Sequence, residues 1–203
     1  MENPEIIKKP DLEYTIHPLL ASRWSPRAYD HRPIENEKLQ RIFEAARWMP
    51  SASNIQPWYF MVGLNGDEVF TKIFDTLVEF NQLWAKNAPV LALAIAKRTN
   101  AKGEINATSQ YDLGQAVAGL SVQSTSEGVY THQMGGFDAI AAAKALSIPD
   151  EFQVVVAFTL GYPGKVETLH PNLQKLELSP RSRRPVSETV FTGKFGQKAD
   201  FLL

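Results

Sequence analysis

The sequence predicts a single α+β domain, and two patterns carry this prediction. Three apolar runs have the length and composition of buried strands, at 58–64, 90–96 and 154–160. Around them, apolar residues recur at three- and four-residue spacing, which is typical of amphipathic helices. The connections between the strands are irregular, which favours α+β over a regular α/β alternation. With 203 residues, 44% apolar and 21% charged, the chain is long enough to bury a core of its own.

The first half of the chain is expected to form a helix, a strand and a second helix. Apolar residues share one helical face over 36–49, and Pro50 ends that pattern. The aromatic and apolar run 58–64 predicts a strand, and Asn-Gly-Asp at 65–67 predicts the turn that follows it. Apolar spacing over 69–77 predicts the second helix.

The second half is expected to centre on a long helix. The strand 90–96 precedes a polar loop, after which small residues run through 108–127. Small side chains allow close approach, so we expect a central helix packed on all sides and ended by Gly128. A helix over 137–146 and the strand 154–160 follow, and a Pro-rich charged stretch occupies 162–187.

The composition excludes several functions. Lys and Arg number 21 against 22 Asp and Glu, so the chain has no excess positive charge for nucleic acid or an anionic membrane. Without cysteine there is no disulfide, thiolate nucleophile or iron–sulfur cluster. The four histidines lack metal-ligand spacing, so no metal site is expected. The start lacks the apolar run of a signal peptide, and a cytoplasmic location is expected. We read residues 1–203 as one domain with an N-terminal arm (1–13) and a C-terminal tail (191–203).

Two basic clusters are candidate anion sites. Arg23 and Arg27 flank Ser25 near a proline, and guanidinium groups bind phosphate oxygens in a bidentate manner. Arg181 and Arg183 form a second cluster far along the chain. Each cluster alone is better explained as solvated surface charge, but together the two clusters make one phosphate site more plausible.

Two further segments contain candidate ligand contacts. Small polar residues at 50–54, followed by Gln56-Pro57-Trp58, suit the edge of a flat heteroaromatic ligand, or else form a turn that caps its own backbone. Gly135 and Gly136 permit close approach of a ligand to the backbone, or serve as a flexible joint before the next helix.

In this order, these blocks resemble the FMN-dependent nitroreductase family. The resemblance rests on Arg23-x-Ser25-x-Arg27, the 50–58 segment, Asn81 to Pro89, His132 to Asp138, Leu160-Gly-Tyr162 and Arg181-Ser-Arg183. It implies a nitroreductase-like α+β fold with a mixed central sheet flanked by helices, and a homodimer that binds FMN at its interface. The sequence departs from the pattern at Gly135, where some members carry an acidic residue. It also departs at Leu83 and Trp84, where some members place a basic residue.

The resemblance also implies roles for individual residues. Arg23, Ser25 and Arg27, with the neighbouring Trp24, would meet the FMN phosphate and ribityl chain, and Arg181 and Arg183 would close the phosphate site. Asn81 would bind the pyrimidine edge of the flavin, and the backbone around Met134, Gly135 and Gly136 would face flavin N5. The remaining contacts would come from the other subunit and cover the isoalloxazine: Pro50, Ser51, Ala52, Ser53 and Asn54. Tyr130 and Phe137 are candidates for the substrate pocket.

The implied function is an FMN-dependent oxidoreductase that takes hydride from NADH or NADPH. Nitroaromatics, quinones and related electron-poor small molecules are the expected acceptors. No protein side chain need act as a catalytic acid, because the chemistry takes place at flavin N5. Two other functions stay open at this point: a flavin carrier or sensor with little turnover, and an anion- or nucleotide-binding module without flavin.

Overall fold

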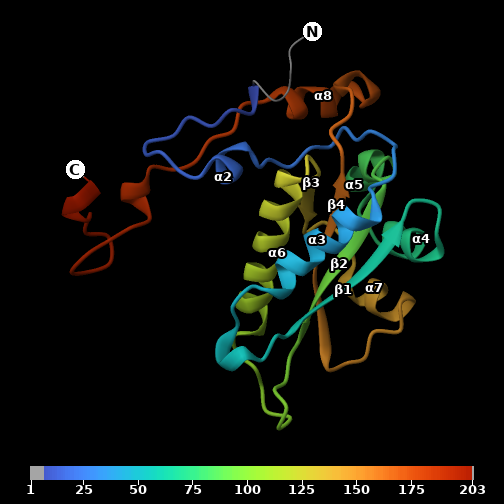
Figure 1. Cartoon of the computed structure of the whole chain (residues 1–203), viewed down its shortest axis with the longest axis horizontal. Coiled ribbons are helices and arrows are strands. Elements are labelled where there is room, and N and C mark those ends of the chain that lie inside the picture. Colours follow the sequence, from blue (N-terminus) through green and yellow to red (C-terminus); the bar gives the residue numbers. More distant parts are fainter. Residues whose placement is uncertain (1–6, 203) are drawn as a thin grey trace.

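The structure is a computed structural model that describes residues 7–202. Its centre is a four-stranded sheet in the order β1-β2-β4-β3, with helices against both faces (Figure 1). The strands are β1 (Trp58–Leu64), β2 (Val90–Lys97), β3 (Tyr130–Met134) and β4 (Phe152–Gly161). One face carries α3 (Asn36–Arg47) and α6 (Ser109–Ser126). The other carries α4 (Glu68–Phe74), α5 (Glu79–Ala85) and α7 (Ala139–Ala145), and α2 (Pro18–Ser22) and α8 (Pro171–Leu178) lie near the start of β3.

All the described strand pairs are antiparallel, whereas the resemblance implied a mixed sheet. The reason lies in the connections. After β1, helices α4 and α5 return the chain to the edge it has just left, so that Leu64 pairs with Val90 and the Asn65 N–H donates to the Pro89 carbonyl at 2.9 Å. A strand that starts where its neighbour ended must run in the opposite direction. The α+β class itself is confirmed.

Strand β2 is buried on both faces, which explains its uninterrupted apolar sequence. Leu91, Leu93 and Ile95 belong to the core on the side of α4, α5 and α7. The intervening alanines belong to the core under α3 and α6: Ala92, Ala94 and Ala96. Large side chains fill the first layer, and small ones allow α6 to pack close to the sheet in the second.

Helix α6 is long, as predicted, but it is not packed on all sides. Leu113, Val117 and Leu120 are buried against the sheet. At Gly119 the helix lies so close to α3 that an added Cβ would lie 2.5 Å from the Met49 sulfur. On the opposite face, Tyr111 is 71% exposed, and Gly114 and Ala118 are exposed as well. In the single chain, one face of α6 is therefore left uncovered.

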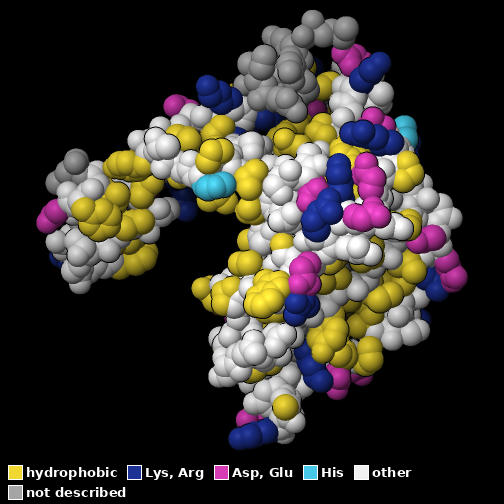
Figure 2. All heavy atoms as spheres, in the orientation of Figure 1, with side chains coloured by type: hydrophobic (Ala, Val, Ile, Leu, Met, Phe, Trp, Pro, Cys, Tyr) yellow, Lys and Arg dark blue, Asp and Glu magenta, His cyan; other side chains and the backbone are white. Residues whose placement is uncertain are grey.

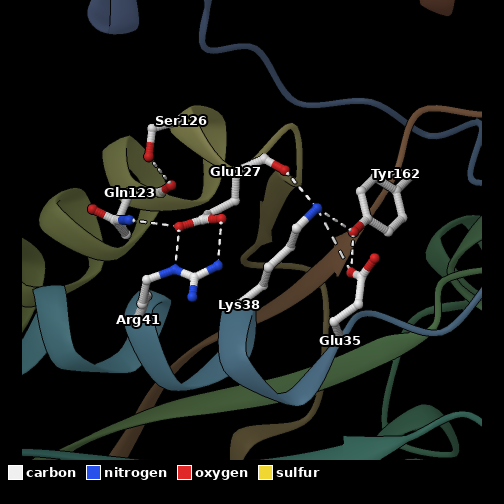
Figure 3. Close-up of polar contacts among 7 residues, drawn as sticks. All are labelled: Glu35, Lys38, Arg41, Gln123, Ser126, Glu127 and Tyr162. Atoms are coloured by element: carbon white, nitrogen blue, oxygen red, sulfur yellow. Dashed lines mark hydrogen bonds and ion pairs between the residues drawn. The ribbon is translucent and has the colours of Figure 1, made fainter.

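Polar contacts hold the start of α3 against the end of α6 (Figure 3). The Lys38 ammonium donates to the Glu127 carbonyl at 3.2 Å and to the Tyr162 hydroxyl at 2.8 Å, and that hydroxyl donates to Glu35. Arg41 forms two hydrogen bonds with the Glu127 carboxylate. These contacts keep the two helices antiparallel, so the end of α3 and the loop after it lie near the start of α6.

Strand β3 and the helices α2, α5 and α8 were not predicted from the sequence. Strand β3 lies at the edge of the sheet and has three polar residues in a row between Tyr130 and Met134, so it lacks the apolar run by which the other strands are recognised. Helix α5 has only seven residues, too few for a periodic pattern to stand out. Helix α8 lies inside the charged stretch that was read as irregular, and its N-cap is the side chain of His170.

Both ends of the described chain contribute to an arm that extends away from the sheet (Figures 1 and 2). The Val186 N–H donates to Glu13 at 2.9 Å, and the Tyr14 hydroxyl donates to the Leu202 carbonyl at 3.4 Å. Of the predicted arm and tail, residues 1–6 and 203 lie outside the described residues. The arm carries exposed aromatic side chains, of which Phe195 is 94% exposed. Within residues 7–202, no helix has both the length and the apolar character needed to cross a membrane.

Candidate functional site

The segment 23–28 lies between α2 and the core, and its side chains divide between surface and interior. Arg23 and Ser25 are half-buried and interact, with the Arg23 guanidinium donating to the Ser25 hydroxyl at 3.4 Å. Trp24 is only 3% exposed and packs edge-on against Tyr130, with ring centroids 6.0 Å apart. Trp24 therefore supports the segment from the interior and offers little side-chain surface to a ligand.

The second basic cluster folds back onto the first. Arg183 lowers the pKa of Arg23, although burial has the larger effect. Burial, Arg23 and Arg183 likewise lower the pKa of Arg181. Within residues 7–202, these three arginines form no ion pair with a carboxylate. Like charges held together without an acidic partner repel one another, and an anion bound between them removes that repulsion.

The two arginines of the second cluster differ in their contacts. All three guanidinium nitrogens of Arg181 donate hydrogen bonds to backbone carbonyls, namely those of Lys8, Ala21 and Arg23. Arg183 is exposed and donates only locally, to the carbonyl of Ser182 at 2.7 Å. The groups with donors to spare for a phosphate are therefore Arg23 and Arg183, while Arg181 is engaged with the backbone.

Gly135 and Gly136 follow the end of β3, and Asn81 from α5 holds them in place. The Asn81 amide donates to the Gly136 carbonyl at 3.0 Å, and the Val78 N–H donates to the same oxygen at 3.1 Å. A Cβ added at Gly136 would lie 2.9 Å from both side chains, whereas one at Gly135 meets nothing within 4 Å. Gly136 is thus required by packing, and the backbone at Gly135 is left open to solvent.

Strand β3 connects the arginines to the glycine pair. The Nδ1–H of His132 donates to the Pro26 carbonyl at 2.9 Å, and Arg27 and Arg23 lie close enough to lower the pKa of His132. From His132 to Gly135 the strand rises about 10 Å. The arrangement suits an elongated ligand, with an anionic end at the arginines and a planar end at the glycines.

Other residues that the sequence analysis assigned to the flavin site lie on the core side of β3. Met134 is buried, and Phe137 packs against the core beside Leu77. Trp84 is fully buried and stacks on Tyr29 and His132, so it does not replace the basic residue that some relatives place at the flavin. Of the two predicted pocket residues, Tyr130 lies by the arginines and Phe137 is turned toward the core.

The loop 50–54 is exposed and is held at the other end of α6. Its Ala52 N–H donates to the buried Asp112 carboxylate at 3.2 Å, and Ser51 accepts from the Gln56 N–H at 2.9 Å. Three non-glycine residues adopt positive φ here, namely Ser53, Asn54 and Gln56. Such strain persists only where the surroundings enforce it, and it is concentrated at functional sites.

A single chain does not bring this loop to the arginines. Trp24 and Arg23 lie near Tyr130, just after the C-terminal end of α6. Asp112, which holds the loop, is in the first turn of the same helix. Fourteen residues of α-helix separate the two ends by about 20 Å. The pieces of the predicted site therefore divide into two groups within one chain.

Two buried carboxylates that support these segments were not anticipated. Glu177, in α8, accepts from the N–H groups of Arg27 and Ala28, and Asp112 accepts from the loop at Ala52. Glu177 shares a helical face with Leu173, four residues earlier, which is the signal that could have identified it as buried. That signal needed the helix α8 to be recognised first.

The comparisons with known proteins agree with the fold and the order of the blocks. The nitroreductase family model matches residues 20–80 and 64–162. A crystal structure of an oxidoreductase containing FMN superposes with a TM-score of 0.89 at 36% identity, covering 98% of this chain and 100% of that one. A 15.4 kDa protein of Mycolicibacterium smegmatis is 31% identical over 148 residues, covering 68% of this chain and 97% of its own. A protein of Archaeoglobus fulgidus, named for NADH dehydrogenase or NAD(P)H nitroreductase activity, is 28% identical over 71% of this chain and 83% of its own. The chain belongs to the nitroreductase family.

Proposed function

We propose that the protein is a homodimeric FMN-dependent oxidoreductase that takes hydride from NADH or NADPH and reduces nitroaromatics, quinones or related electron-poor acceptors. The observation that carries the proposal is the convergence of Arg23 and Arg183, from opposite ends of the chain, without a carboxylate partner within residues 7–202. The solved FMN-containing relative supports the choice of flavin, and the Archaeoglobus relative supports a nicotinamide donor.

The residues present fit FMN. Arg23 and Arg183 would hold the phosphate, with Ser25 as a further donor, and Arg27 would reach the ribityl chain from the same segment. Asn81 keeps Gly136 fixed through its amide, so the open backbone at Gly135 lies in a defined position for the flavin ring. When bound, FMN supplies hydride transfer, and the protein supplies binding, orientation and electrostatics.

Two features of the chain support a site shared between subunits. The exposed face of α6 carries small residues at Gly114 and Ala118, which permit close helix contact. If a second copy packs here about a twofold axis with the helices antiparallel, the start of one α6 lies beside the end of the other. The loop 50–54 of one subunit then meets the arginines of its partner, which a single chain cannot achieve.

The arm provides the second feature. Figure 2 shows a broad hollow between the arm and the body, and Figure 1 places α6 on that side of the body. The arm presents several exposed apolar side chains, among them Leu20, Phe195 and Phe201. Apolar side chains that are exposed together are typical of a surface that binds another protein. A second copy seated in the hollow would cover them together with Tyr111.

The test is direct. The purified protein should be yellow and should release FMN, one per subunit, on denaturation. It should then oxidise NADH or NADPH when a nitroaromatic or a quinone is supplied. FMN binding without turnover on any donor and acceptor pair would make the protein a flavin carrier or sensor. A colourless protein that takes up no FMN on reconstitution, or one that carries FAD, would refute the proposal.

A further inference from the structure

Glu177 is a buried carboxylate whose partners are all in the anion-binding segment or next to it. It is 1% exposed, and its two oxygens accept from the Arg27 N–H at 3.0 Å each, while one also accepts from the Ala28 N–H at 3.1 Å. Burial raises its pKa, although these hydrogen bonds and the nearby charges of Arg27 and Lys8 act in the opposite direction. A carboxylate kept in the interior at this cost is held there by specific contacts.

Arg181 holds the other side of the same segment. Its Nε donates to the Lys8 carbonyl at 2.6 Å, and its two terminal nitrogens donate to the carbonyls of Arg23 and Ala21. The planar guanidinium matches three carbonyls at fixed angles, which an ammonium group cannot do. Arg181 lies four residues after Glu177, in the extended segment that follows α8.

The two side chains therefore fix both ends of a short stretch. Arg181 holds the backbone at Ala21 and Arg23, Glu177 holds it at Arg27 and Ala28, and Ser25 lies between them. We infer that Glu177 and Arg181 are positioning residues that place the phosphate-binding side chains of segment 23–27. This inference rests on the proposed function, in which Arg23 and Arg183 bind the FMN phosphate.

A positioning role makes a distinctive prediction. Loss of either contact lets segment 23–27 move relative to Arg183, so the contacts with the phosphate weaken. The contacts with the ring, which depend on Asn81 and the glycine pair on β3 and α5, are unaffected. Riboflavin has the same ring and ribityl chain as FMN and lacks the phosphate. The ratio of the riboflavin Kd to the FMN Kd therefore reports on the phosphate site alone.

The experiment compares this ratio in the wild-type dimer and three variants. Glu177→Gln keeps one acceptor oxygen but turns an N–H₂ group toward a backbone donor, and Arg181→Lys keeps the charge but loses the guanidinium geometry. The control, Glu167→Gln, makes the same charge change at an exposed position after β4. Flavin fluorescence on titration gives both dissociation constants without any measure of turnover. Thermal melting of each flavin-free variant reports separately on folding.

We expect Glu177→Gln and Arg181→Lys each to lower the ratio about tenfold or more, as for loss of a charge-assisted hydrogen bond, with a much smaller rise in the riboflavin Kd from the contact of Arg27 with the ribityl chain. The control should match the wild type. If the wild type itself does not prefer FMN to riboflavin, the proposed phosphate site fails and the inference falls with it. If the wild type prefers FMN and both variants keep that preference, or weaken both flavins equally, the phosphate site stands and the positioning role is refuted. Should Glu177→Gln fail to fold, Arg181→Lys decides by the same criteria.

Discussion

Arg23 and Arg183, from opposite ends of the chain, line the same cavity, where burial and then the charge of Arg183 lower the pKa of Arg23. Two cations held together in this way destabilise the flavin-free protein and attract an anion. The contact also explains why neither basic cluster identifies the site alone. Each cluster supplies part of the positive charge, and only the fold brings the parts together.

Arg23→Ala and Arg183→Ala should each weaken FMN binding about tenfold or more, because each removes a charge-assisted contact with the phosphate. Riboflavin binding should change little. The melting temperature of the flavin-free protein should stay the same or rise, since the repulsion between the two arginines is removed. Lys72→Ala, which removes an exposed charge paired with Glu68 on α4, is the control and should leave both flavins unaffected. FMN affinity unchanged in both arginine variants would mean that these arginines are ordinary surface charges.

Gly136→Ala should destabilise the fold by about 1–3 kcal/mol, the usual cost of forcing an extra methyl group into a packed site. The new Cβ would lie 2.9 Å from the side chains of Asn81 and Val78. Gly135→Ala is the matched control, because its Cβ meets nothing within 4 Å. Chemical denaturation of the two flavin-free variants gives the comparison. If both variants have the same free energy of unfolding, the Asn81 and Val78 side chains can move aside for the methyl group without loss of stability.

The stability of the protein should depend on the protonation of His132. Burial, together with the charges of Arg27 and Arg23, lowers the pKa of this residue to about 4, although the hydrogen bond to the Pro26 carbonyl acts in the opposite direction. The folded protein therefore keeps His132 neutral below pH 6.5, where the unfolded chain already binds a proton. The free energy of unfolding should fall as the pH drops from about 6.5 to about 4, by up to about 3 kcal/mol from this residue.

Other groups titrate in the same range, so the contribution of His132 needs a difference measurement. Glu177 acts in the opposite direction, since its raised pKa favours the folded state at lower pH. His132→Asn cannot titrate and keeps a polar group near the Pro26 carbonyl. Urea denaturation between pH 4 and pH 7 should show a shallower loss of stability in this variant than in the wild type. Parallel curves would mean that His132 is not held neutral.

The strongest periodic patterns of the sequence were reliable guides to the fold. The apolar run of β2 predicts a buried strand, and the structure confirms it, with one face of β2 in each of the two cores. Strand β3 was missed because an edge strand needs only one apolar face, and Tyr130-Thr-His-Gln-Met134 has no continuous apolar run. Prediction of α6 as packed on all sides was wrong for one chain, because small residues indicate close packing without saying which molecule supplies the partner.

The candidate site shows the same limits. The order of the blocks predicted Arg23, Arg183, Asn81 and the glycine pair as parts of one site. It could not distinguish Arg183 from Arg181, since two arginines two residues apart look alike until one of them is seen to donate to three backbone carbonyls. Nor could it find Glu177, whose role depends on the backbone of a segment far away in the sequence.

Flavin binding and dimerisation should be linked, because the loop 50–54 can reach the arginines only from a second subunit. A ligand held by both subunits stabilises the assembly by about 2.7 kcal/mol at a hundredfold excess over its Kd. FMN should therefore raise the melting temperature and shift sedimentation toward the dimer. Asn54→Ala should weaken FMN binding with less dependence on salt than Arg23→Ala, since no phosphate contact is lost.

A substitution on α6 separates the shared site from one contained in a single chain. Ala118 is exposed in one chain and lies on the uncovered face of the helix, so Ala118→Arg should fold as well as the wild type. In the proposed dimer it places a large cation between two closely packed helices, and sedimentation should show monomers. FMN affinity should fall with it, although Ala118 touches neither the arginines nor the glycine pair. Asn172→Arg, which makes the same charge change at an exposed position of α8, should leave both the dimer and the flavin affinity intact. A monomeric Ala118→Arg protein that binds FMN as tightly as the wild type would refute the shared site.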